Sequence, residues 1–241
     1  KLPDGTQVID GSGKYLVPGF TDAHVHFFQS GGLYARPDVI DLRKIKPYDK
    51  QLNWVHNNME EFLRRYAAIG ITSVIDVGAS FNFLSQRDSF TNKPYAPVIR
   101  MTGPLLTTYV PAPYKDLGNE SPFGMMLTEE GVRQSVRNQL PLKTDFIKIW
   151  YIVQGTDKEA GARKNLALVN AAIDEAHKNN LRVAVHATQR ITAQLAVEAG
   201  ADFLVHSVED EIVNDDFIQL LKKNKTVLCP TLVVRDNYGK V

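Results

Sequence analysis

Strand-like and helix-like segments alternate along most of this chain, and this alternation constrains the fold more than any other sequence feature. Helical spacing of apolar residues predicts helices over five segments: 51–69, 129–140, 160–179, 190–199 and 210–223. Short apolar runs predict strands over seven segments: 18–26, 71–77, 97–102, 145–151, 181–186, 202–206 and 226–229. This pattern predicts an α/β fold with a parallel sheet covered by helices.

The strand ends carry the residues that could do chemistry, which favours a closed barrel over an open doubly wound sheet. Functional side chains of a (β/α)₈ barrel converge on the carboxyl ends of its strands. The candidates here are four histidines and one lysine: His24, His26, Lys148, His186 and His206. No glycine-rich phosphate loop follows any strand, which weighs against a nucleotide-binding sheet. The sequence therefore predicts a TIM-like (β/α)₈ barrel, with seven strands present.

The first predicted strand ends in two histidines that are separated by one residue. Strand side chains alternate between faces, so His24 and His26 point the same way and can hold one ion between them. A zinc-class ion takes about four donors at roughly 2.0–2.2 Å, so further ligands must come from elsewhere. His186 and His206 end the two successive strands 181–186 and 202–206, which places their imidazoles side by side. A single histidine of this kind is more often a core residue, but four at strand ends indicate a metal site.

Lys148 lies inside an apolar strand, where a charged amine is expensive to bury. One solution is a lowered pKa that leaves the amine neutral. A neutral amine can add carbon dioxide, and the two oxygens of the resulting carbamate can bridge two metal ions. The alternative is that the side chain extends along the barrel wall to the solvent at its rim.

Composition excludes several function classes. The chain has 241 residues, 44% of them hydrophobic, and a net charge of +1, which favours neither nucleic acid nor an anionic membrane as partner. No apolar run is long enough to cross a bilayer. The single cysteine, Cys229, cannot form an internal disulfide and is expected only to pack, so the cellular compartment stays undetermined. We expect a small-molecule partner.

Two segments lie outside the repeating pattern. Residues 1–17 contain two short apolar runs around Gly11–Gly13 and are expected to be part of a small β-sandwich, with residues 18–241 forming the barrel. Residues 103–126 are rich in proline and aromatics, and are expected either to wall or cover the barrel mouth or to pack on the surface. Tyr109 and Tyr151 are candidate substrate-binding residues, although each could simply pack. The two remaining histidines fall in helical patterns and are not expected to be ligands: His56 and His177.

Three features together resemble the amidohydrolase superfamily. They are the segment Leu16-Val17-Pro18-Gly19-Phe20-Thr21-Asp22-Ala23-His24-Val25-His26, the segment Asp145-Phe146-Ile147-Lys148-Ile149, and the strand-ending His186 and His206. The sequence is most similar to the imidazolonepropionase-like and prolidase-like metallohydrolases. The resemblance implies that His24 and His26 bind a first metal ion, that a carboxylated Lys148 bridges, and that His186 and His206 bind a second. It implies hydrolysis of an amide or peptide-like C–N bond by a metal-bridging hydroxide, with zinc, manganese, iron or cobalt as the ion.

The chain departs from this family pattern in one respect. Members carry an aspartate at the end of strand eight, which takes a proton from the attacking water, and no residue here matches it. The chain is therefore expected to be a fragment whose open sheet edges favour self-association. Three alternatives stay open: a cyclic-amide hydrolase, a mononuclear deaminase, for which a bridging lysine is unnecessary, and a metal-binding barrel that is catalytically incomplete. Substrates compatible with the sequence include an apolar dipeptide, a dipeptide with a prolyl or basic C-terminal residue, and an imidazolone-like ring.

Overall fold

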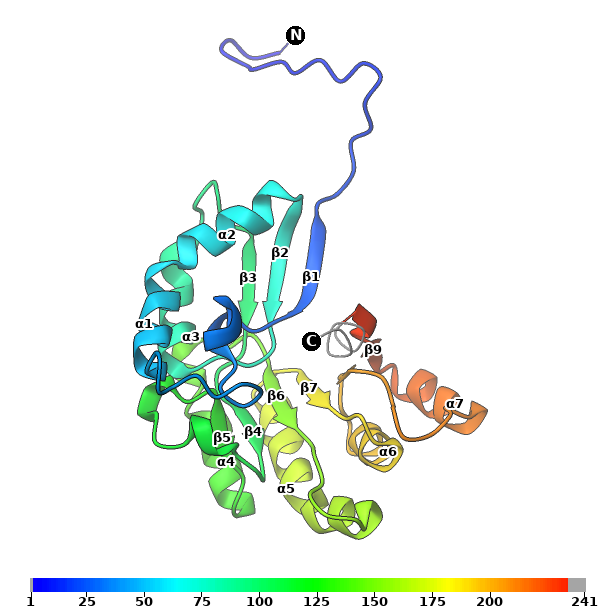
Figure 1. Ribbon diagram of the computed structural model, residues 1–241. Helices are drawn as coiled ribbons and strands as arrows, with labels where there is room; N and C mark the ends of the chain where they lie inside the picture. The colour runs from blue at the N-terminus through cyan, green and yellow to red at the C-terminus, as the bar shows by residue number, and fades with distance from the viewer. Residues whose placement is uncertain (1, 234–241) are drawn as a thin grey trace.

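The computed structural model describes residues 2–233, and its strands curve around one central space with the helices outside (Figure 1). Nine strands fall within these residues: β1 (Phe20–Val25), β2 (Ile71–Asp76), β3 (Val98–Met101), β4 (Leu105–Thr107), β5 (Phe123–Met125), β6 (Ile147–Trp150), β7 (Val183–His186), β8 (Phe203–Val205) and β9 (Val227–Cys229). The helices are α1 (Tyr48–Asn57), α2 (Met59–Ala68), α3 (Phe81–Arg87), α4 (Glu129–Arg137), α5 (Lys158–Lys178), α6 (Arg190–Glu198) and α7 (Asp215–Asn224).

The strands form two parallel sheets that continue one another. The first has the order β1-β2-β3, and the second has the order β5-β4-β6-β7-β8-β9. Asp145 joins them, because its backbone N–H donates to the Met101 carbonyl at 3.0 Å and its carboxylate accepts from the Met101 N–H at 2.8 Å. The seven predicted strands thus follow one another around the wall, and the prediction of an incomplete TIM-like barrel is confirmed.

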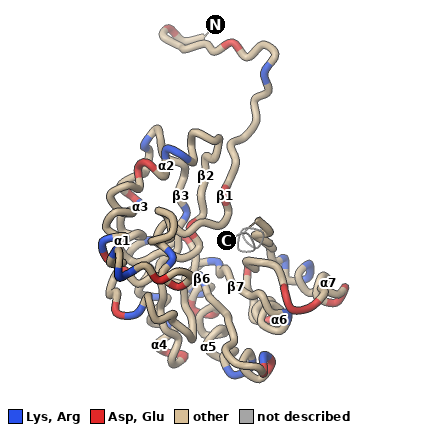
Figure 2. The backbone as a smooth tube through the Cα atoms, in the orientation of Figure 1, with Lys and Arg blue, Asp and Glu red and all other residues tan. Residues whose placement is uncertain are grey.

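Helices cover the outer face of each sheet and create two separate cores. One core lies between the β6–β8 strands and α4, α5 and α6, where Val169, Ile173 and Val185 are almost fully buried. The other lies between β1–β3 and α1, α2 and α3, around Leu52, Leu63 and Val74. A small cluster inside the barrel contains Val77, Phe146, Ala184 and Val205. Lysines and arginines are interspersed with acidic residues over the outer helices (Figure 2).

Some local features differ from the sequence predictions. The helix predicted over 51–69 is divided at Asn58, whose side-chain amide donates to the Trp54 carbonyl at 2.7 Å and so ends α1. Helix α3 was not predicted; Ser80 caps it by accepting a hydrogen bond from the Phe83 N–H at 3.2 Å. Residues 103–126 contain β4, β5 and two short 3₁₀ helices rather than irregular chain alone.

The expected β element near the N-terminus is not formed. Residues 2–17 contain no strand, their side chains are exposed, and they extend away from β1 (Figure 1). A short hairpin without further strands to pair with is marginal in water, which explains this result. Assignment of residues 1–17 to a β-sandwich stays a prediction. Of the helices in residues 2–233, none has both the length and the apolar character needed to cross a bilayer.

A polar cluster fastens the 103–126 segment to the outer helices. His56 of α1 contacts Glu120 at 3.1 Å through Nε2 and Gln86 at 2.6 Å through Nδ1. Burial lowers the pKa of His56, but the hydrogen bonds to Glu120 and Gln86 outweigh it, so the pKa is raised above 6.5. Burial raises the pKa of Glu120, but hydrogen bonds from His56 and Asn82 prevail, so that pKa lies below 4.5.

These shifts predict a pH-dependent contribution to stability. The His56 contribution is fully present below pH 6.5 and is lost as pH rises through the raised folded-state pKa, whereas the Glu120 contribution is present above pH 4.5 and is lost on acidification. Between pH 6 and pH 8, we expect the free energy of unfolding to fall by about 0.5–1 kcal/mol more in the unchanged protein than in His56→Gln. Urea unfolding at several pH values measures this, with His177→Gln as the control, and parallel curves for the protein and His56→Gln would contradict it.

The two ends of the strand order, β1 and β9, each have a hydrogen-bonded neighbour on one side only within the described residues. Both carry exposed apolar side chains: Phe20 is 67% exposed and Val227 is 53% exposed. Open edges with apolar side chains pair readily with other chains.

We therefore expect this chain to self-associate through β1 and β9. Val227→Lys should shift the population toward monomer, because a lysine on an edge strand opposes pairing. Size-exclusion chromatography with light scattering measures this. Val39→Lys, at an exposed position in the connection after β1, is the matched control. A sharp monomer peak for the unchanged chain would disprove the expectation.

Candidate metal centre

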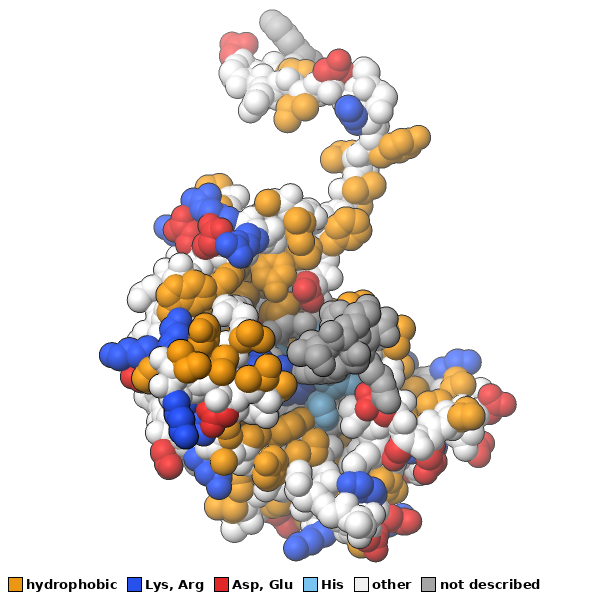
Figure 3. All heavy atoms as spheres, viewed as in Figure 1, with side chains coloured by type: hydrophobic (Ala, Val, Ile, Leu, Met, Phe, Trp, Pro, Cys, Tyr) orange, Lys and Arg blue, Asp and Glu red, His pale blue; other side chains and the backbone are white. Residues whose placement is uncertain are grey.

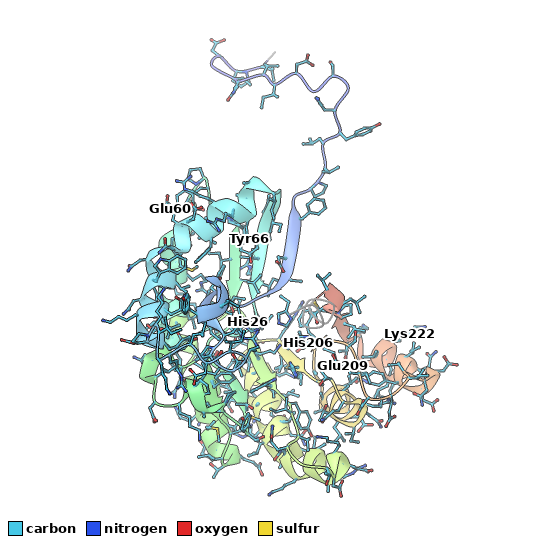
Figure 4. The ribbon with its side chains drawn as sticks, viewed as in Figure 1. His26, Glu60, Tyr66, His206, Glu209 and Lys222 are labelled. Atoms are coloured by element: carbon cyan, nitrogen blue, oxygen red, sulfur yellow. The ribbon has the colours of Figure 1, made fainter. Side chains whose placement is uncertain are left out.

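The five predicted ligands lie around one cavity at the carboxyl ends of the strands. His24 is in β1 and His26 directly follows it, Lys148 is in β6, His186 is the last residue of β7, and His206 directly follows β8. All five line a cavity of about 1030 Å³. Figure 3 shows histidine side chains in this hollow, and Figure 4 shows His26 and His206 turned toward the same central space. The predicted convergence of these side chains is what the structure displays.

His24 and His26 have the geometry of two donors for one ion. Their Nε2 atoms are 3.3 Å apart, and two nitrogens bound to one tetrahedral zinc-class ion at about 2.0–2.1 Å lie about 3.3 Å apart. The Nδ1 atom of His26 is 3.0 Å from the Gly78 carbonyl. A proton on that nitrogen donates to the carbonyl and leaves the lone pair of Nε2 directed into the cavity.

His186 and His206 form a second pair on neighbouring strands. Their ring centroids are 4.5 Å apart, and His206 is also 4.8 Å from His24, so the two pairs adjoin. His206 has a left-handed backbone (φ 76°), a conformation uncommon for residues with a side chain, yet its N–H still donates to the Cys229 carbonyl. Its Nδ1 contacts the Thr231 hydroxyl at 2.6 Å, leaving Nε2 for another partner.

Lys148 lines the same cavity as the two pairs and does not reach solvent. Its side chain is only 2% exposed, which excludes the alternative of an amine at the barrel rim. Burial lowers the pKa of Lys148 from 10.5 to about 7. The amine is therefore neutral in a large fraction of molecules near neutral pH, and a neutral amine is the form that carbon dioxide can carboxylate.

The histidines are held neutral by their surroundings. Burial, followed by the nearby charge of Lys148, lowers the pKa of His26 to about 3 and that of His206 to about 4. Burial also depresses the pKa values of His24 and His186. Neutral imidazole is the form that binds metal ions.

The side chains that line this cavity are of a kind that can bind metal ions. The Nδ1 atom of His24 is buried without a hydrogen-bond partner, which marks the ring as incompletely satisfied. Within residues 2–233, no three His, Cys, Asp or Glu side chains gather closely enough to hold a metal ion by themselves. Two histidines for each ion is the arrangement that the resemblance implies, with a modified Lys148 as the shared ligand.

Asp76 is a site residue that the sequence analysis missed. It ends β2, is fully buried, and accepts hydrogen bonds from the N–H groups of Phe27 at 2.9 Å and Gly78 at 3.0 Å. Its Oδ1 is 3.8 Å from Nδ1 of His26, and burial raises its pKa to about 7. Asp76 thereby holds the backbone of Phe27, which follows His26, and of Gly78, whose carbonyl contacts the His26 ring. The available signal was an acidic residue inside the apolar run 71–77, the same kind of anomaly that singled out Lys148.

The tyrosine candidates lie elsewhere. The Tyr151 side chain is 2% exposed, donates its hydroxyl proton to the Ala162 carbonyl at 2.6 Å, and packs between β6 and α5. The structure thus agrees with the alternative that Tyr151 only packs. Tyr109 is 40% exposed and lies outside the cavity lining, with its ring 6.3 Å from Trp150.

The remaining residues singled out from the sequence also have clear positions. His56 and His177 lie in α1 and α5, away from the cavity, as expected. Cys229 is a free thiol at the end of β9. The 103–126 segment supplies Leu105, Pro111, Tyr114 and Phe123 to the cavity, so of the two expectations for this segment, the pocket wall is the one that the structure supports.

Comparison with known proteins identifies the family. A model of the amidohydrolase family matches residues 15–231, which is most of the chain. The chain belongs to the amidohydrolase family. No curated protein matches it significantly.

Solved structures with similar folds include hydrolases of several kinds. A prolidase complexed with N-methylphosphonate-L-proline is 24% identical (TM-score 0.72, covering 97% of this chain and 57% of that one). A Xaa-Pro dipeptidase is 22% identical (TM-score 0.61, covering 89% and 53%), and the A. niger ochratoxinase is 18% identical (TM-score 0.68, covering 92% and 54%). At these identities the likeness shows the fold alone. The chain spans a little over half the length of these proteins.

The packing around Gly78 gives a test of the first histidine pair. A Cβ atom at Gly78 would lie 2.7 Å from Leu105 Cδ2 and 3.1 Å from His26 Cε1, so alanine there requires both side chains to shift, and we expect the His26 ring to move by a few tenths of an ångström. We expect Gly78→Ala to weaken zinc binding by about tenfold, as changes behind a ligand commonly do. Calorimetric titration of metal-free protein with Zn²⁺ measures this, and Gly11→Ala, where a Cβ meets nothing within 4 Å, is the control. Equal affinity in both variants would contradict the assignment of His26 as a ligand.

Proposed function

We propose that this chain forms the catalytic barrel of a metal-dependent hydrolase that cleaves an amide or peptide-like C–N bond. The observation that carries the proposal is the presence of two histidine pairs and a buried lysine in the lining of one large cavity. Membership of the amidohydrolase family supports it, as does the similarity of the fold to those of a prolidase and a Xaa-Pro dipeptidase. A small-molecule amide or dipeptide is the expected substrate.

Two divalent ions, zinc by preference, fit the donors in this cavity. His24 and His26 would hold the first ion, His186 and His206 the second, and a carbamate on Lys148 would contact both. Imidazole and carboxylate-like oxygen are donors that zinc accepts, and manganese, iron and cobalt accept them too. Such ions supply an activated water near neutral pH and polarise a carbonyl group.

The chain's own residues prepare this site. The Gly78 carbonyl accepts a hydrogen bond from Nδ1 of His26, and the Thr231 hydroxyl forms a hydrogen bond with Nδ1 of His206. These contacts fix the direction of both rings. Burial keeps the imidazoles uncharged and the Lys148 amine reactive toward carbon dioxide. We assign no residue of this sequence as general base, because none matches the family's strand-eight aspartate.

Lys148 also separates this proposal from its rivals. A mononuclear deaminase or cyclic-amide hydrolase needs no bridging ligand, and a lysine that is buried in the same cavity as both histidine pairs supports the binuclear interpretation. A lysine in that position costs stability unless its amine is neutral or modified. The binuclear arrangement is therefore preferred.

The proposal predicts both metal content and turnover. Protein prepared with Zn²⁺ or Mn²⁺ and bicarbonate should bind about two equivalents of metal and release amine from a dipeptide such as Met-Pro. Lys148→Ala should lose about 100-fold or more in rate, because the shared ligand is removed. With ¹³C-bicarbonate, a carbamate signal in the NMR spectrum should be present in the unchanged protein and absent from Lys148→Ala.

His177→Ala is the matched control, since His177 lies on α5 outside the cavity. Full activity in Lys148→Ala would disprove the role of the lysine. Two bound equivalents without hydrolysis of any amide would instead support the alternative of a metal-binding barrel that is catalytically incomplete.

A further inference from the structure

A continuous series of aromatic contacts runs along one side of the cavity from one histidine pair to the other. Phe28 and Tyr114 have ring centroids 6.0 Å apart, Tyr114 and Phe123 are 5.2 Å apart, and Phe123 and Trp150 are 5.3 Å apart. At its ends, Phe28 lies 5.5 Å from His26 and Trp150 lies 5.9 Å from His186. We call Phe28, Tyr114, Phe123 and Trp150 the aromatic wall.

The segments that carry the candidate ligands also place the two ends of this wall. Trp150 follows Lys148 by two residues in β6, so both side chains lie on the cavity side of that strand. Phe28 follows His26 by two residues in the short helix after β1. Tyr114 and Phe123 come from the 103–126 segment and lie between Phe28 and Trp150 in the series. A group bound at the metal centre would therefore have the aromatic wall directly beside it.

The wall differs in accessibility along its length. Phe28 and Tyr114 are each only 1% exposed, so they form the base of the wall. Phe123 and Trp150 are half-buried and line the cavity, so they offer apolar surface that a ligand can cover. The ring of Tyr109 lies 6.3 Å from that of Trp150 but does not line the cavity.

The charged groups near the wall compensate one another. Arg36 donates to Asp38 through Nε at 3.0 Å and Nη2 at 2.9 Å, and Tyr114 donates its hydroxyl proton to the same carboxylate at 2.6 Å. The positive charge of Arg36 and the negative charge of Asp38 therefore face each other, and the four rings of the wall carry no charge. An uncharged apolar group gains from covering such a surface, whereas a charged group placed against the four rings would lose hydration that they cannot replace. The other two charged residues of the described cavity lining, Lys148 and Glu209, are not part of the wall.

We propose that the aromatic wall is a specificity subsite that binds an uncharged aryl or branched alkyl substituent of the amide substrate. This rests on the proposed amide hydrolysis and extends it to a substrate class. Among the substrates compatible with the sequence, the proposed subsite favours those with a large apolar substituent over those with a basic one.

The chain offers a direct binding test, because its two tryptophans are Trp54 and Trp150. Trp54 packs on Phe62 in the outer helices, away from the cavity. In Trp54→Phe, the fluorescence therefore reports on Trp150 alone. We expect benzamide to change this fluorescence. Its affinity should be at least about tenfold higher than that of acetamide, which has the same amide group without the ring. 4-Carboxybenzamide should bind at least about tenfold more weakly than benzamide, because its charge lies against the wall.

Substitutions then locate the binding. Calorimetry should show benzamide affinity reduced about tenfold in Phe123→Ala and in Trp150→Leu, which keeps an apolar side chain in β6. Trp54→Ala should bind like the unchanged protein. Equal affinity for benzamide and acetamide, or full benzamide affinity in both wall variants when they are folded by circular dichroism, would overturn the proposal.

Benzamide binding and the hydrolysis of N-acyl dipeptides together separate this proposal from the function on which it rests. If benzamide binds as expected but metal-loaded protein hydrolyses no N-benzoyl or N-acetyl dipeptide, the wall stands and the proposed hydrolysis fails. If both dipeptides are hydrolysed with equal kcat/KM, the hydrolysis stands and the subsite fails. A preference for the N-benzoyl substrate that disappears in Phe123→Ala supports both.

Discussion

The parallel hydrogen-bond ladder from β6 to β9 is the interaction on which the rest of the site depends. Its register pairs Lys148 with Ala184, Trp150 with His186, and His186 with Val205, so the residues needed at the cavity arrive at neighbouring strand ends. Strand alternation then directs Lys148 inward and Tyr151 outward. A shift of one residue in β6 would turn Lys148 to the opposite face of the sheet and leave a buried amine in the outer core.

Much of this arrangement could be predicted from the sequence, because it repeats. Strand periodicity located the seven wall strands, and the recurrence of a histidine at successive strand ends located both pairs. The role suggested for Tyr151 was at odds with the same periodicity: it lies three residues after Lys148, and odd separations in a strand place side chains on opposite faces. Tyr109, the other tyrosine expected to contact substrate, lies next to Trp150 and is not among the residues that line the cavity.

Other features depend on contacts that leave no local pattern. Strands β4 and β5 have three residues each, too few for alternation to be recognised. Asp76 acts through two backbone N–H groups, and a single acidic residue gives no sign of such partners. The aromatic wall joins positions as far apart as Phe28 and Trp150, and only the folded chain brings them into contact.

Asp145 has a consequence for how the molecule holds together. It links the two sheets at the end opposite the metal centre, and Arg87 and Arg100 bind its carboxylate at 2.8 and 3.0 Å. Each sheet has its own core, so the two halves can behave as separate cooperative units of folding. The histidine pairs belong to different halves. The Asp145 ion pairs would then connect the two halves at one end of the barrel, and metal ions that share Lys148 would connect them at the other. With both connections in place, amide hydrogen exchange in each half would depend on whether the other half is folded.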